Sequence, residues 1–359
     1  MSAAPDLALT NEILKHLREA GFARVGVCDA APVDRADAFQ SWLAAGHHAD
    51  MRYMAEHLAE RLDPRVMVPG AQSVVCVADR YNDGRPDARS VDGAPAGRIA
   101  RYARGRDYHA VLRERLEPIA ESLRNRFPGQ RFRVCVDTAP IAEREHAVRA
   151  GIGRIGKHTL VIGQGGLGSW IVLGAIVTTV RLQPTEAAGG DPCGSCTRCI
   201  DACPTQAIEP WKVKADRCIS YLTIEHHGEP AAWFRERSDD WLFGCDACIE
   251  ACPHSQWTVK ARMSPVRSDY AALQRHFTLE AVLRWRETDP AFQSLSPVLR
   301  RPSLASWKRN ALLLASGLPA HRWETGLLAA VQACEEDEAL PVQVRQLASS
   351  VRRSASTHA

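Results

Sequence analysis

The stretch of sequence that decides the fold is a cysteine-rich segment, which begins Cys193-Gly-Ser-Cys196-Thr-Arg-Cys199-Ile-Asp-Ala-Cys203-Pro204 and ends Cys245-Asp-Ala-Cys248-Ile-Glu-Ala-Cys252-Pro253. Its first half has the spacing C-x2-C-x2-C-x3-C-P. In this spacing, two-residue loops bring three thiolates to three corners of one iron–sulfur cube, and the fourth Cys serves a second cube. The segment therefore predicts a module that holds two 4Fe–4S clusters.

The cysteines of the segment, with Cys218 between its two halves, divide evenly between two such clusters. Cluster one is predicted to be held by Cys193, Cys196, Cys199 and Cys252. Cluster two is predicted to be held by Cys203, Cys218, Cys245 and Cys248. A structural zinc site also uses Cys pairs two residues apart and is the alternative, but a third Cys followed by C-P is not a zinc-ribbon pattern.

Length and composition exclude several classes of protein. A chain of 359 residues can form two or three domains, and a net charge of +3 does not by itself indicate nucleic-acid binding. The first residues lack the basic and apolar segments of a signal peptide, and no apolar run approaches the roughly 18 residues of a membrane-spanning helix. We therefore expect a cytoplasmic protein without membrane contact, in which the other four cysteines are small core residues: Cys28, Cys76, Cys135 and Cys334.

Residues 1–180 are predicted to form one domain of mixed α+β or α/β class. Helices are predicted at 10–21, 37–45, 51–58, 108–126 and 141–150, and strands at 22–28, 73–78, 131–136, 158–163 and 168–180. The run 73–78 is continuously apolar, which is typical of a strand buried on both faces. The segment 81–96 is rich in Asp, Gly and Pro and is predicted to be a surface loop.

Residues 181–265 are predicted to form the cluster module, and residues 266–359 a helical region. Its helices are predicted at 278–287, 303–316, 323–334 and 339–352. Two of them resemble the inner helices of HEAT-type repeats. Because one or two such repeats cannot bury a face alone, we expect this region to dock on the rest of the protein.

Asp137 stands at the end of an apolar strand and before a helix, where side chains often project into a cleft. The simpler interpretation is that Asp137 or Thr138 caps the helix near Pro140. The glycines at 151, 153 and 156 would let the backbone approach a flat or anionic ligand, or they form an ordinary turn after a helix. Their match to a dinucleotide-binding motif is weak, because it follows a helix.

Several motifs, taken in order along nearly the whole chain, resemble the epoxyqueuosine reductase family. Besides the cysteine module, they are Arg61-Leu-Asp63-Pro64, Pro69-Gly70-Ala71, Asp107-Tyr108-His109, Asp137-Thr-Ala-Pro140, Gly156-Lys157-His158-Thr159, Gly168-Ser169-Trp170, Cys218-Ile-Ser220-Tyr-Leu-Thr-Ile-Glu225 and Lys308-Arg309-Asn310-Ala311. The cysteine module and the Asp137 and Gly-Lys segments make the resemblance specific.

The resemblance implies a fold and a function. Members of the family bind base-off cobalamin in an N-terminal α/β domain, place two 4Fe–4S clusters beside it and end in HEAT-like helices. In this architecture they are similar to cobalamin-dependent reductive dehalogenases. Their substrate is tRNA carrying epoxyqueuosine at the wobble position, which they reduce to queuosine. We accordingly expect tRNA as a partner and an external electron donor of the flavodoxin or ferredoxin type.

The family pattern also implies residue roles. It makes Asp137 the proton donor, for which we expect a pKa raised by desolvation under the corrin. The residues expected around the corrin or its tail are Arg61, Asp137, Gly156, Lys157, Val161, Leu173, Ser220 and Asp246. The sequence departs from the pattern after the second C-x2-C, where Ile249 and His254-Ser255 replace the usual residues. No D-x-H-x-x-G motif for a His-ligated cobalamin follows Asp107, in agreement with the base-off form.

The segment from Arg300 to Arg309 offers four cations and Trp307 for contact with an anticodon loop, and its alternative is a solvated helix face. Two other functions remain open at this point. The chain could act like a reductive dehalogenase on a small molecule, or it could be a non-catalytic electron carrier that uses only the clusters.

Overall fold

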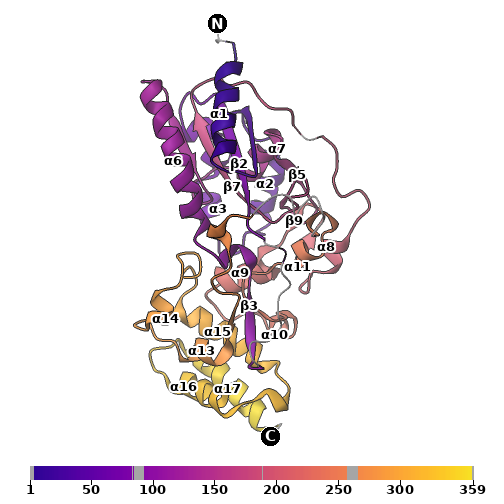
Figure 1. The fold of residues 1–359 in the computed structure, drawn as a ribbon. Helices are drawn as coiled ribbons and strands as arrows, with labels where there is room; N and C mark the ends of the chain where they lie inside the picture. Colours follow the sequence, from indigo (N-terminus) through magenta and orange to yellow (C-terminus); the bar gives the residue numbers. More distant parts are fainter. Residues whose placement is uncertain (1–3, 83, 85–92, 188, 257–265, 358–359) are drawn as a thin grey trace.

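The computed structural model describes residues 4–82, 84, 93–187, 189–256 and 266–357. The molecule is elongated, with the N-terminus at one end and the C-terminus at the other (Figure 1). A sheet with flanking helices forms the N-terminal half, helices form the C-terminal half, and the cysteine module lies beside the junction of the two. No helix among the described residues is both long and apolar enough to cross a membrane.

The central sheet has the strand order β1-β2-β7-β4, and each neighbouring pair is antiparallel. Its strands are β1 (Arg24–Asp29), β2 (Ser73–Arg80), β4 (Phe132–Cys135) and β7 (Ile171–Thr178). An antiparallel sheet makes this half α+β, the first of the two predicted classes. All residues of β2 are buried, which confirms the prediction of a strand covered on both faces.

Helices cover both faces of this sheet. Helices α1 (Leu7–Glu19) and α6 (Tyr108–Arg126) lie side by side on one face (Figure 1), where their apolar residues share a core with β2. Helix α7 packs on the other face. The expected start of α1 at Thr10 is wrong, because the Asp6 carboxylate caps the helix by accepting a hydrogen bond from the Leu9 amide at 2.8 Å. The remaining helices here are α2 (Ala36–Ala44), α3 (Tyr53–Glu56), α4 (Leu58–Leu62), α5 (Pro64–Met67) and α7 (Glu143–Arg149).

The cysteine module packs tightly against a hairpin of this half, formed by β5 (Gly153–Ile155) and β6 (Val161–Gly163) and its following turn. Gly168 has a φ of +61°, and a Cβ there would lie 2.6 Å from the His254 carbonyl oxygen, so only glycine permits this approach. Ser255 accepts a hydrogen bond from the Ser169 amide at 3.0 Å, so one of the departures from the family pattern stabilises the contact. The module contains α8 (Arg198–Asp201), β8 (Ile208–Glu209), β9 (Lys212–Val213), α9 (Ile219–Ile224), α10 (Ala232–Arg237), β10 (Trp241–Phe243) and α11 (Ala247–Glu250).

The C-terminal helices confirm the predicted helical region. They are α13 (Leu279–Arg284), α14 (Pro290–Gln293), α15 (Leu304–Ser316), α16 (Thr325–Glu336) and α17 (Val342–Thr357). Trp307 and Ala311 of α15 are fully buried in a core shared with Phe234 and Trp241 of the cysteine module. The region therefore docks on the module, as expected for so few repeats.

A second sheet joins all three predicted domains. Its order is β10-β3-β11, in which β3 (Ala96–Ile99) comes from the N-terminal half and β11 (His276–Thr278) from the C-terminal region. Strand β3 was not predicted, and residues 83 and 85–92 of the expected loop lie outside the described residues. The boundaries at 180 and 265 stay a prediction, but the packing ties the three parts together.

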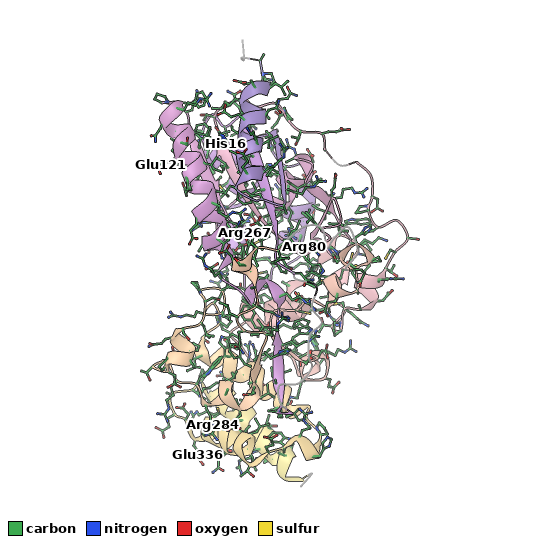
Figure 2. The ribbon with its side chains drawn as sticks, in the orientation of Figure 1. His16, Arg80, Glu121, Arg267, Arg284 and Glu336 are labelled. Carbon is green, nitrogen blue, oxygen red and sulfur yellow. The ribbon has the colours of Figure 1, made fainter. Side chains whose placement is uncertain are left out.

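The chain also returns to the N-terminal half at the start of the C-terminal region. The Tyr270 hydroxyl donates to the buried Asp79 carboxylate at 2.8 Å. Arg267, labelled in Figure 2 where the two halves meet, forms an ion pair with Asp269 at 2.9 Å, and Asp269 also pairs with Arg106 of the N-terminal half at 2.7 Å. Contacts on both sides of the junction thus fix the helical region relative to the sheet.

Candidate active site and cluster module

Four of the predicted ligands line one cavity. Cys193, Cys196, Cys199 and Cys252 surround a space of about 110 Å³, together with His158, Pro192, Pro253 and His254. Burial raises the pKa of Cys199 to about 11, and the neighbouring thiols of Cys252 and Cys193 raise it further. The space is larger than the roughly 10–15 Å³ that a cavity needs to hold one water, and the cage of four thiols that lines it supplies the donors that a 4Fe–4S cluster uses.

The other four predicted ligands also gather. Burial raises the pKa of Cys218, Cys245 and Cys248. Neighbouring thiols raise these pKa values as well: Cys203 raises that of Cys218, and Cys218 raises those of Cys245 and Cys248. Cys199 of the first group also acts on Cys248, so the two groups adjoin. Among the described residues, no three Cys, His, Asp or Glu side chains are placed to hold a single metal ion.

Asp137 does not cap a helix. Helix α7 begins at Glu143, and its N-cap residue Ala142 makes no side-chain cap, so the capping interpretation is wrong. Asp137 instead has a φ of +47°, in the left-handed region that Asp tolerates at a cost. Its amide donates to the Glu143 carboxyl group at 2.6 Å, which holds the turn in place.

The Asp137 carboxylate belongs to a hydrogen-bonded row of three side chains. His109 Nε2 lies 3.0 Å from Asp137 Oδ2, and His109 Nδ1 lies 2.7 Å from Asp107 Oδ1. Asp107 also caps α6 by accepting a hydrogen bond from the His109 amide at 2.9 Å. The start of α6 therefore fixes the imidazole so that one nitrogen faces each carboxylate.

In the protein alone the pKa of Asp137 is lowered, so the rise expected under the corrin stays a prediction. Burial, the largest influence, does act to raise it, but the hydrogen bond and charge of His109, with Arg301 and Tyr108, together lower the pKa below its ordinary value. The two carboxylates in turn outweigh burial at His109 and raise its pKa to about 9. In the free site at neutral pH, the proton of this row therefore lies on His109.

Glu143 is the second acid at the site. Burial raises its pKa to about 8, and the nearby charge of Asp137 adds to the effect. The Asp137 side chain is 52% exposed. The protein around it nevertheless removes part of its water and so acts to raise its pKa. We call this half-exposed surface around the Asp137 carboxylate, with Glu143 beside it, the recess.

Arg61 on α4 lies near the two acids. Burial lowers the pKa of Arg61, and the charges of Tyr53, Glu143 and Asp137 oppose this effect. Its Nε is buried and has no hydrogen-bond partner. A buried, unpartnered donor beside an open recess is a feature that a polar ligand would satisfy, so Arg61 fits its predicted place around a cobalamin.

The other predicted cobalamin residues are placed as follows. Gly156 and Lys157 are buried in the turn between β5 and β6, Val161 is buried in β6, Leu173 is half-buried in β7, Ser220 is half-buried in α9, and Asp246 is buried before α11. A Cβ at Gly156 would lie 2.8 Å from Ile162, so the turn has no room for a side chain. Asp246 accepts a hydrogen bond from the Arg101 amide at 2.8 Å, and burial raises the pKa of Asp246 to about 6.

The predicted row of cations in the C-terminal region is partly wrong. Trp307, Lys308 and Arg309 are buried, so they cannot contact RNA. The Arg309 guanidinium donates to the backbone oxygens of His226, Gly228 and Leu222, at 2.5, 3.0 and 2.7 Å. It therefore stabilises the fold, because the helical periodicity of α15 turns this segment towards the module.

Arg300 and Arg301 remain exposed, and Arg301 reaches the Asp137 site. Arg301 pairs with Glu225, and its guanidinium carbon lies 5.7 Å from the centre of the Tyr53 ring. The charge of Arg301 is one of the influences that lower the pKa of Asp137. A cation from the C-terminal region and a partly exposed aromatic ring from α3 thus flank the recess.

The sequence reasoning missed His109, Glu143, Tyr53 and Arg301 as partners of Asp137. The signal for His109 was present in Asp107-Tyr108-His109, an Asp two residues before a His at the start of a helix. Tyr53 and Arg301 had no such signal, because only the fold brings these distant segments together.

Comparisons with known proteins identify the family to which the chain is similar. Residues 61–138 match the family "Epoxyqueuosine reductase QueG, DUF1730", and residues 192–255 match the "4Fe-4S double cluster binding domain". An epoxyqueuosine reductase of Xanthomonas campestris is 37% identical over 334 residues, which cover 91% of each chain. One of Synechocystis is 39% identical over 283 residues, which cover 77% of this chain and 94% of the relative.

Solved structures share the fold. The crystal structure of an epoxyqueuosine reductase with a tRNA-Tyr epoxyqueuosine-modified tRNA stem loop has a TM-score of 0.81 at 26% identity, and covers 97% of this chain and 90% of its own. The structure of epoxyqueuosine reductase from Streptococcus thermophilus has a TM-score of 0.82 at 24% identity and covers 98% of this chain and 91% of its own. The predicted fold class is thereby confirmed.

Proposed function

The chain belongs to the epoxyqueuosine reductase family, and we propose that it reduces epoxyqueuosine to queuosine at the wobble position of tRNA. The observation that carries the proposal is that two adjoining groups of four thiols and the Asp107–His109–Asp137 row occur in one fold, where burial raises the pKa of Tyr102 and the charges of Asp137 and of Asp246, the neighbour of Cys245, both raise it further. A tRNA substrate places this activity in the cytoplasm.

Converting an epoxide to an alkene consumes two electrons and two protons and releases water. Side chains cannot supply the electrons; 4Fe–4S clusters and a cobalamin, when bound, would supply one-electron transfer at low potential. We assign the clusters to the two groups of cysteines given above. The residues that would surround the cobalamin are Arg61, Asp137, Gly156, Lys157, Val161, Leu173, Ser220 and Asp246.

Asp137 is proposed as the donor of the proton to the departing oxygen. Its carboxylate is charged in the free site, but a nucleoside that covers the recess would exclude water and disfavour the charged pair of Asp137 and His109. The neutral pair forms when the proton moves from His109 Nε2 to Asp137 Oδ2 along their 3.0 Å hydrogen bond. Asp137 then donates that proton to the oxygen, and Asp107 holds the imidazole in place.

The tRNA is proposed to bind across residues 266–359 and the recess. Arg300 and Arg301 are exposed there, and Arg301 and Tyr53 flank the place where the modified base must enter. Electrons from a flavodoxin or ferredoxin type of donor are proposed to enter at cluster one. Gly194, Ser195 and Thr197 of its ligand loop are exposed, so a donor can approach this cage directly.

The proposal is tested by anaerobic reconstitution with iron, sulfide and cobalamin, followed by incubation with epoxyqueuosine-modified tRNA and a chemical reductant. We expect queuosine in the digested tRNA, and none when either the clusters or cobalamin are omitted. A reconstituted protein that binds both cofactors yet leaves epoxyqueuosine intact would overturn the proposal.

A further inference from the structure

The ammonium group of Lys157 points into the loop that carries two ligands of cluster one. Lys157 Nζ donates to the carbonyl oxygens of Gly194 and Cys196, at 2.7 and 3.0 Å. The side chain is 8% exposed. Its hydrogen-bond partners are carbonyl groups, and no carboxylate among the described residues forms an ion pair with it.

The backbone of Lys157 is fixed to the same module. The Lys157 amide donates to Cys193 Sγ at 3.3 Å, and the Lys157 carbonyl accepts from the Trp211 amide at 3.0 Å. Its ammonium nitrogen lies 5.7 Å from the centre of the Trp211 ring. Lys157 thus contacts the cage of cluster one with its backbone and with its charge.

A buried cation without a charged partner is costly unless negative charge lies close to it. The cage beside Lys157 would supply that charge, because a cube held by four thiolates is anionic and becomes more so when it accepts an electron. The potential of such a cluster depends on net charge and on hydrogen bonds to its sulfurs. Lys157 provides a nearby positive charge and an amide hydrogen bond to Cys193.

We propose that Lys157 is a positioning residue of cluster one, which holds the Cys193–Cys196 loop and raises the reduction potential of the cluster by its charge. The inference rests on the two-cluster assignment of the proposed function. It adds a task for Lys157 that differs from contact with the corrin. One electron is added to the cluster on reduction, and no proton or other reactant is required.

The test is an anaerobic redox titration followed by electron paramagnetic resonance, on protein reconstituted with iron and sulfide but without cobalamin or tRNA. In Lys157→Gln, which keeps an N–H donor but removes the charge, the equilibrium constant for reduction of one cluster should fall about tenfold, or about 59 mV for one electron. The second cluster should keep its potential. Lys157→Arg should restore most of the shift.

Lys212→Gln is the matched control, because Lys212 lies in the same module but is exposed and paired with Glu209. It should change neither potential. Unchanged potentials in Lys157→Gln, or equal shifts in Lys157→Gln and Lys157→Arg, would contradict the inference.

Iron content covers the case in which Lys157→Gln loses a cluster. A fall from about eight irons to about four in Lys157→Gln, with eight retained in Lys157→Arg, would support the role of the charge. Loss in both variants would overturn it. A wild-type protein that binds no cluster would overturn the proposed function as well, whereas bound clusters with unshifted potentials would remove only the role of Lys157.

Discussion

The cysteine module and the Asp137 site are assembled in different ways. Seven of the eight predicted ligands stand in two short runs, 193–203 and 245–252, so the local spacing already groups them. The Asp137 site collects Asp107 and His109 from the start of α6, Glu143 from α7, Tyr53 from α3 and Arg301 from the C-terminal region. The module depends on spacing, and the site depends on tertiary packing.

Cys218 is the exception within the module, and removing it has the largest expected effect. It lies outside both runs and joins the second cage only through the fold. Cys218→Ser should lose cluster two and keep cluster one, so that iron analysis falls from about eight to about four per chain.

Cys334→Ser is the control for this change. Cys334 is a buried thiol that donates to the Leu283 carbonyl oxygen at 3.4 Å, far from the module in sequence. It should leave the iron content unchanged. Loss of both clusters, or of neither, in Cys218→Ser would mean that the ligand assignment is wrong.

The pH dependence of the reaction tests the row of three side chains. Because His109 holds its proton up to a pKa of about 9, the single-turnover rate should fall as the pH rises through about 9. In His109→Gln this limb should disappear, and the rate at pH 7 should be lower by roughly 10²-fold. A retained limb in the variant would assign it to another group.

The same pKa affects stability with a definite sign. The pKa of His109 is raised from 6.5 to about 9 in the folded protein, so its contribution is fully present below about pH 6.5. It is lost as the pH rises through about 9. Thermal unfolding of the wild type and His109→Gln should therefore differ most at the lower pH and converge above about 9.

Arg309 and Arg300 are close in sequence, but Arg309 is buried and Arg300 is exposed. Replacing each of them distinguishes a role in folding from a role in tRNA binding, and these are the smallest effects that we expect. Arg309→Met would leave three buried carbonyl groups without their donor, at a cost on the order of 3 kcal/mol of unfolding free energy. Arg300→Met should change the free energy of unfolding by less than about 0.5 kcal/mol. It should lower the affinity for tRNA and make that affinity less dependent on salt concentration. Denaturant unfolding and filter binding measure the two, and a reversed pattern would contradict the burial described for α15.

The sequence predicted the parts of this protein that local rules determine. The spacing of the cysteines, the apolar run of β2 and the periodicity of α6 and α15 each specify an element without its neighbours. What could not be predicted depends on packing: the burial of Lys308 and Arg309, the insertion of β3 between β10 and β11, and the lowered pKa of Asp137. The pKa of Asp137 in the protein alone depends on the imidazole of His109, which comes from another element and which no local sequence rule places beside it.

Replacing Asp137 by Asn tests the central claim most directly. Asn tolerates the left-handed backbone that Asp137 adopts and keeps its size, but it cannot deliver a carboxyl proton. The variant should bind both clusters and cobalamin as the wild type does, while anaerobic single-turnover conversion of epoxyqueuosine in tRNA falls by roughly 10²–10⁴-fold. Near-normal conversion by Asp137→Asn, with both cofactors bound, would contradict the assignment of Asp137 as the proton donor.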